Sequence, residues 1–218
     1  MSSRAALLVA AVVTGALYVV GAIALGSSPD ASDTPGKVLE WFRDHHDAAR
    51  TYAWTASLGM LAFAVMAGVI RGLLPSPAGD VFLLGAAAFI VETTIQAWIW
   101  AALALHPGAL APETARGLLD VALFWGPLLT GATCMMIGAV TVLGLRSDAL
   151  IPRWLTVLGA IAFTEQAIET ITVFGTDGFT APGGDMNIVL GAGLTLLWLI
   201  GLVVWAYREL GAMHPSTA

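Results

Sequence analysis

Two short polar stretches lie at the centres of long apolar segments. If these segments span a membrane, their acidic residues lie near the centre of the bilayer. The first is Glu92-Thr-Thr-Ile-Gln96 and the second is Glu165-Gln-Ala-Ile-Glu169. An acidic residue at the bilayer centre costs about 3 kcal/mol on the insertion scale, so three such glutamates indicate a function. Apart from Arg153 at the very end of one segment, no Lys, Arg or His lies in these segments to neutralise them, and we expect at least one carboxyl to be protonated at pH 7. A carboxylic acid kept protonated in apolar surroundings can act as a general acid.

Helical elements must position these side chains. With a rise of about 1.5 Å per residue, Glu92 lies roughly 17 Å along segment 81–105 and Glu165 roughly 18 Å along segment 153–174, so the two share a depth. Helical spacing places one stripe of such residues on each segment. The stripe of segment 81–105 comprises Phe89, Glu92, Gln96 and Trp100. The stripe of segment 153–174 comprises Gly159, Ala162, Glu165, Gln166, Glu169 and Thr172. If the stripes face each other, they form a polar patch at mid-bilayer with aromatic rings beside it.

The composition is that of an integral membrane protein. Of the 218 residues, 58% are hydrophobic and 11% are charged, and the mean hydropathy is +0.83, whereas soluble proteins carry about 25% charged residues. Apolar runs of about 20 residues are long enough to cross a bilayer. Six spans are predicted at residues 5–26, 51–70, 81–105, 118–145, 153–174 and 187–207. The fold class is therefore predicted to be all-α, with residues 1–218 forming one six-helix transmembrane bundle.

Basic residues favour an orientation with both termini in the cytoplasm, which would place the protein in a bacterial-type plasma membrane as a multi-pass protein. The long connection 27–50 would then lie outside. Thr34-Pro35 is a typical helix start, and Val38, Trp41, Phe42 and His45 share one face of the segment that follows. This pattern predicts a short interfacial helix over about 35–48 that roofs the bundle.

Several kinds of site find little support. Cys134 is the only cysteine, so no intramolecular disulfide can form. The net charge of −6 and the lack of a basic cluster exclude nucleic acid as a partner. Asp44-His-His-Asp47 contains metal-ligand side chains, but its solvated helical setting favours a simple charged surface, so neither a metal nor another cofactor is expected.

The segment Gly144-Leu-Arg-Ser-Asp-Ala-Leu-Ile-Pro-Arg-Trp-Leu155 resembles a turn of uncharacterised six-helix membrane proteins of bacteria. That resemblance concerns architecture and implies no function. In size, helix count, buried acids and aromatic residues, the chain is also similar to small membrane-bound terpene cyclases that close meroterpenoids by protonation, by analogy and without a shared motif.

The first hypothesis is an intramembrane terpene cyclase that uses general acid catalysis on a linear or prenylated isoprenoid. Glu165 or Glu169 would be the acid and Glu92 its partner or the final base. Residues that would line the substrate site and stabilise the carbocation are Phe89, Gln96, Trp100, Phe124, Trp125 and Gln166.

Two alternatives belong to other classes. One is a proton-coupled carrier of a small hydrophobic molecule, which uses the same carboxyls as a relay. Such carriers often contain paired broken helices, whereas the sequence predicts a break only at Pro127, in the span 118–145. The other is a non-catalytic membrane subunit whose buried acids pair with basic residues of a protein partner. Whether the surroundings of Glu165 are closed or open to water would separate the enzyme from the carrier.

Overall fold

The structure is a computed structural model and describes residues 2–213. The predicted all-α fold class is confirmed, because these residues form helices and no strand. Six of the helices are long and apolar enough to cross a membrane, as a multi-pass membrane protein requires.

The helices of the structure cover the six predicted spans. They are α1 (Ser3–Leu25), α3 (His46–Arg71), α4 (Ala78–Leu105), α5 (Pro112–Leu123) with α6 (Trp125–Gly144), α7 (Arg153–Glu169) and α8 (Ala192–Met213). Two spans contain irregular turns: α7 continues as a 3₁₀ turn, η2 (Thr170–Phe174), and α8 is preceded by a π-helical turn, η4 (Met186–Gly191). Short 3₁₀ turns η1 (Pro107–Ala109) and η3 (Gly178–Thr180) lie in connections.

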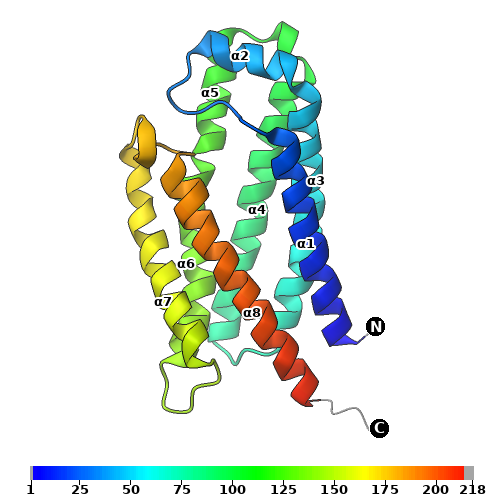
Figure 1. Cartoon of the computed structure of the whole chain (residues 1–218), viewed down its shortest axis with the longest axis vertical. Coiled ribbons are helices and arrows are strands. Elements are labelled where there is room, and N and C mark those ends of the chain that lie inside the picture. Colours follow the sequence, from blue (N-terminus) through cyan, green and yellow to red (C-terminus); the bar gives the residue numbers. More distant parts are fainter. Residues whose placement is uncertain (1, 214–218) are drawn as a thin grey trace.

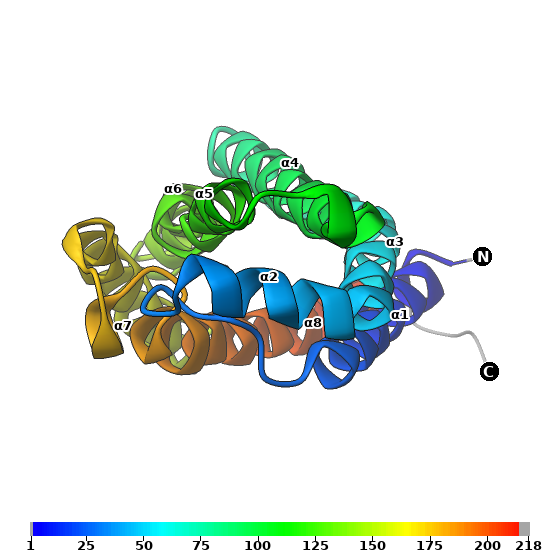
Figure 2. The same ribbon diagram turned by 90° about the horizontal axis from the view of Figure 1, so that it is seen from above.

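The spans form a ring in chain order. Neighbours in the ring are α1 and α3, α3 and α4, α4 and α6, α6 and α7, α7 and α8, and finally α8 and α1. Figure 1 shows α8 crossing the bundle diagonally, and Figure 2 shows α6 between α4 and α7. The interior is filled by apolar side chains from all six spans, including the fully buried Leu7, Ile70, Met136 and Trp198.

A short helix, α2 (Pro35–Asp44), lies across one end of the bundle, which we call the α2 end (Figure 1). Thr34 caps it by accepting a hydrogen bond from the Lys37 backbone N–H at 3.4 Å. Val38 and Phe42 are buried, as expected, but Leu39 is the third buried residue and His45 is exposed. The helix is shorter than predicted because His45 ends it and α3 begins at His46.

The expected break near Pro127 is present, one turn away from the proline itself. Proline has no N–H, so Pro127 cannot donate to the carbonyl of Leu123. The chain turns at Phe124, which separates α5 from α6.

Large apolar side chains cover the outside of the bundle. Ile23, Leu61, Leu145 and Phe174 are all more than two-thirds exposed, at 75%, 68%, 72% and 84%. Such a surface indicates a lipid bilayer around the spans.

Candidate functional site

The second polar stretch forms a buried hydrogen-bond network on α7. Glu165, Gln166 and Glu169 are 9%, 4% and 3% exposed. The Gln166 Nε2 amide donates to Glu165 Oε2 at 3.0 Å and to Glu169 Oε2 at 2.6 Å. Thr133 of α6 donates its hydroxyl to Gln166 Oε1, which fixes the orientation of that amide. One glutamine thus holds two carboxyl groups side by side.

Asn187 completes the network from the π-helical turn η4, and neither it nor Thr133 was predicted from the sequence. Its Nδ2 amide donates to Glu169 Oε1 at 2.5 Å and to Thr172 Oγ1 at 3.3 Å. Its Oδ1 accepts the Gly183 backbone N–H at 2.9 Å. An asparagine at the end of an apolar span gave a signal, but Asn187 is 18 positions from Glu169, and only the fold brings the two together.

Two glycines make room for this network. A Cβ on Gly191 would overlap Glu169 Oε2 and would lie 2.7 Å from its Cδ and 2.9 Å from Gln166 Nε2. A Cβ on Gly126 would lie 2.8 Å from Cγ of Asn187. These distances are below any normal contact of a Cβ. The lack of a side chain therefore lets η4 approach α7 closely at Gly191 and lets α6 approach η4 closely at Gly126.

The electrostatics favour a bound proton. Glu165 Oε2 and Glu169 Oε2 both accept a hydrogen bond from Gln166 Nε2 and are therefore less than about 6 Å apart. At that distance, two negative charges repel strongly in apolar surroundings. The ion pairs formed within residues 2–213 all lie elsewhere, so no cation neutralises the pair. Glu165 Oε1 is buried and finds no hydrogen-bond partner in the described chain. The arrangement can hold, accept or donate a proton.

The first polar stretch lies in a different place. Gln96 accepts a hydrogen bond from the Tyr52 hydroxyl of α3 at 2.7 Å. Glu92 Oε2 is buried, and no partner for it occurs among residues 2–213. In the ring, α6 lies between α4 and α7 (Figure 2), and no hydrogen bond of the described chain connects Glu92 or Gln96 with Glu165 or Glu169. Glu92 is not part of the network around Glu169.

The aromatic residues expected to line one wall are dispersed. Phe89 packs against Phe63 of α3 with ring centroids 5.1 Å apart and the rings tilted by 35°. Trp100 is buried in a ring cluster with Trp41, Phe42 and Tyr52 near the α2 end. Trp125 donates its indole N–H to Thr93 Oγ1 of α4 at 3.4 Å. Phe124 lies at the α2 end in a surface cleft, so a role for these residues with one substrate stays a prediction.

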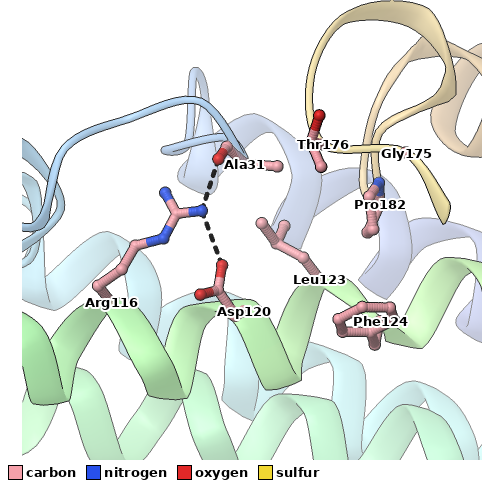
Figure 3. A pocket seen from close by; sticks show the side chains of 8 residues that line it. All are labelled: Ala31, Arg116, Asp120, Leu123, Phe124, Gly175, Thr176 and Pro182. Atoms are coloured by element: carbon pink, nitrogen blue, oxygen red, sulfur yellow. Dashed lines mark hydrogen bonds and ion pairs between the residues drawn. The ribbon is translucent and has the colours of Figure 1, made fainter. Parts of the chain in front are cut away.

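That cleft, which we call the α2-end cleft, has a volume of about 260 Å³. Its lining residues are Ala31, Arg116, Asp120, Leu123, Phe124, Gly175, Thr176 and Pro182 (Figure 3). Arg116 connects α5 with the loop before α2 at one wall of this cleft. Its guanidinium donates to the carbonyls of Asp33 and Ala31 at 2.5 Å each and pairs with Asp120 at 2.7 Å. A second cleft of about 350 Å³ lies at the opposite end, beside Trp154, Trp205 and Arg208. Neither cleft is lined by Glu92, Glu165 or Glu169.

The segment Asp44-His-His-Asp47 does not gather ligands. His45 stacks on Trp41 with ring centroids 4.9 Å apart, and His46 lies 3.5 Å from Asp47. Residues 2–213 contain no group of three metal-ligating side chains with the proximity that a metal site needs.

Comparison of the chain with protein-family models, with curated proteins and with solved structures gave no match. The resemblance of segment 144–155 to uncharacterised bacterial proteins and the analogy with terpene cyclases therefore stay predictions. The six long apolar helices are consistent with a multi-pass membrane protein of all-α fold.

Proposed function

We propose that this protein is a proton-coupled membrane carrier of a small hydrophobic molecule and that Glu165 and Glu169 form its proton-binding site. One observation carries the proposal: two buried carboxyl groups share the Gln166 amide, and no cationic side chain of the described chain pairs with them. Ionisable groups inside the membrane are expensive and commonly mark proton relays. A pair that holds one proton can release it when its surroundings change.

The helix irregularities support a carrier. The α7 span changes to a 3₁₀ turn directly after Glu169, and the α8 span begins with the π-helical turn that contains Asn187. Irregular turns of this kind are frequent at functional sites, and broken helices hold coupling sites in many transporters. The sequence suggested a break in one span only, whereas two adjacent spans are irregular beside the carboxyl pair.

The subunit alternative finds less support. A subunit that offers its acids to a partner helix would keep them accessible at a surface. Here the hydrogen-bond donors to Glu169 are Gln166 and Asn187 of the same chain, and both glutamates face the interior.

The terpene cyclase remains a second candidate because of Glu165. Its Oε1 has no partner among the described residues, so a proton on that oxygen would be free to leave to a bound alkene or epoxide. The reaction would add this proton to the isoprenoid, close the ring through a carbocation and return a proton to a carboxylate. Against it, the aromatic residues are dispersed and both clefts lie at the ends of the bundle.

Proton flux in liposomes tests the proposal. The protein would be reconstituted with a pH-sensitive dye inside, and gradients of small hydrophobic molecules, including linear and prenylated-aromatic isoprenoids, would be imposed. We expect at least one gradient to move protons, and we expect Glu169→Gln to reduce the flux to that of empty liposomes because an amide cannot exchange the proton. The exposed Glu113→Gln change serves as the matched control and should leave the flux unchanged.

The same samples separate the second candidate. Cyclisation conserves mass, so a product with new chromatographic retention and unchanged mass that is lost in Glu165→Gln would identify a cyclase. Equal proton flux in the parent and in Glu169→Gln, for every compound, would contradict the carrier.

A further inference from the structure

We infer that water and protons reach the Glu165–Glu169 pair from the α2 end, through the α2-end cleft and past Asn187, and that the opposite side of the pair is closed. This inference rests on the proposed proton site and adds the direction from which that site is loaded. It follows from what lies on each side of the pair.

On the α2 side, polar groups connect the cleft to the carboxyls. Pro182 lines the cleft, and the next residue, Gly183, donates its N–H to Asn187 Oδ1 at 2.9 Å. Asn187 donates in turn to Glu169 Oε1 at 2.5 Å, and Gln166 connects Glu169 to Glu165. The Asn187 side chain therefore connects, by hydrogen bonds, the segment that follows Pro182 to the first carboxyl.

Glycines lie beside the residues that line the cleft and beside Asn187. Leu123 and Phe124 line the cleft, and a Cβ on Gly183 would lie 2.7 Å from Leu123 Cδ2. Gly126, two residues after Phe124, packs directly against Asn187. The cleft-lining Leu123 and the network residue Asn187 therefore each pack directly against a glycine of the neighbouring segment.

The cleft itself suits water and protons. Its volume of about 260 Å³ holds several water molecules. The loop that forms one wall carries Asp177 and Asp185, both exposed, whereas Asp120 on the other wall is paired with Arg116. Carboxylates at an entrance raise the local concentration of cations, protons included.

On the other side, residues 155–162 of α7 contain no ionisable side chain, and the stripe is tightly packed. Ala162 is fully buried, one turn from Glu165 towards the start of α7, and Leu155 is 1% exposed. Trp198 of α8 is also fully buried and lies against Gly159, where a Cβ would be 3.3 Å from its indole nitrogen. The nearest atom to a Cβ at Gly159 would be Oγ1 of Thr141, so α6, α7 and α8 pack closely here, although Thr141 Oγ1 and Trp198 Nε1 find no hydrogen-bond partner among residues 2–213.

Cysteine accessibility tests the direction. Cys134 is the only cysteine, so a Cys134→Ala background allows single reporters at Thr176, Glu169, Thr172, Ala162 and Arg208. A membrane-impermeant thiol reagent would be applied to either face of sealed vesicles, because only a thiolate in contact with water reacts. Thr176→Cys, in the cleft, and Arg208→Cys, at the opposite end, would assign the two faces.

We expect Glu169→Cys and Thr172→Cys to react from the face that labels Thr176→Cys, and Ala162→Cys to react from neither face. Adding Asn187→Leu, which keeps the branching at Cγ but removes the amide, should slow Glu169→Cys about tenfold and leave Thr176→Cys unchanged. Size-exclusion chromatography would show whether each variant folds. Because Glu169→Cys and Thr172→Cys report on the same place, the test still works if one of them does not fold.

The inference is wrong if Glu169→Cys and Thr172→Cys react from the Arg208 face, or if folded reporters at both positions react from neither face. Labelling does not depend on proton coupling, so the two proposals can fail separately. Flux that depends on Glu169 together with labelling from the Arg208 face would refute the route alone, and one-sided labelling without flux would refute the carrier alone.

Discussion

Replacing Gly191 with alanine is expected to lower the free energy of unfolding by about 3 kcal/mol or more, which is a large effect for one methyl group. The added Cβ would overlap Glu169 Oε2 and press against Gln166 Nε2 at 2.9 Å. Either η4 moves away from α7 and takes the Asn187 amide with it, or the Glu169 carboxyl shifts and loses its hydrogen bonds. Both outcomes leave a buried polar group unsatisfied, which is costly. Unfolding in mixed micelles with increasing denaturing detergent would measure the loss.

Gly193→Ala is the matched control, two residues further along the same span. No atom lies within 4 Å of a Cβ at Gly193. Because alanine favours helix over glycine by about 1 kcal/mol, this variant should be as stable as the parent or slightly more stable. Equal stability of the two variants would mean that η4 does not approach the carboxyl pair as described.

The second large effect concerns the contact between Asn187 and Glu169. Asn187→Leu and Glu169→Leu should each reduce stability by about 2 to 3 kcal/mol, because each leaves a buried partner without its hydrogen bond. The double variant should lose clearly less than the combined losses of the single variants, with a coupling energy of about 1 to 3 kcal/mol. The Asn187 amide and the Glu169 carboxyl are 2.5 Å apart and both residues are 3% exposed, so little solvent weakens their interaction.

Mixed-micelle unfolding of the four proteins of this cycle would give the coupling energy directly. A parallel cycle with Thr164→Val in place of Asn187→Leu provides the control, because Thr164 is exposed and bonds only to the carbonyl of Ala160 in its own helix. Strict additivity in the Asn187 cycle would contradict the network.

Most of the fold could be predicted from the sequence because hydropathy alone determines which segments span a bilayer. The six spans, the short helix that starts at Pro35 and the break near Pro127 all follow from local patterns. The end of that short helix was misjudged because the apolar spacing continues to His45, whereas the backbone turns there to begin α3.

The candidate site was only half visible in the sequence. Glu165, Gln166 and Glu169 are neighbours on one helix, so their proximity follows from helical spacing. Which helices surround them depends on the order of spans around the ring, and the sequence does not encode that order in any local pattern. Asn187 and Gly191 contribute to the site only because a π-helical turn brings the start of the last span against α7.

The expectation that Glu92 shares a cavity with Glu165 rested on equal depth. Equal depth is necessary for contact but does not establish it, because α6 lies between the two helices (Figure 2). The aromatic residues illustrate the same point: Trp100 and Phe89 share a stripe of α4, yet Trp100 packs with Tyr52 and Phe89 packs with Phe63. A stripe defines a direction on one helix, and the neighbouring helices decide what each residue meets.

The central claim is that the Glu165–Glu169 pair holds a proton at neutral pH, and modification by a hydrophobic carbodiimide tests it most directly. The reagent attacks protonated carboxyl groups, and peptide mass spectrometry identifies the modified residue. At pH 7 we expect Glu165 or Glu169 to be modified while the exposed Glu113 is not, and we expect the modification to disappear in the Glu165→Gln, Glu169→Gln double variant. Modification of the pair only at the low pH at which Glu113 also reacts would show that both carboxyls are ionised at neutral pH and would contradict the account.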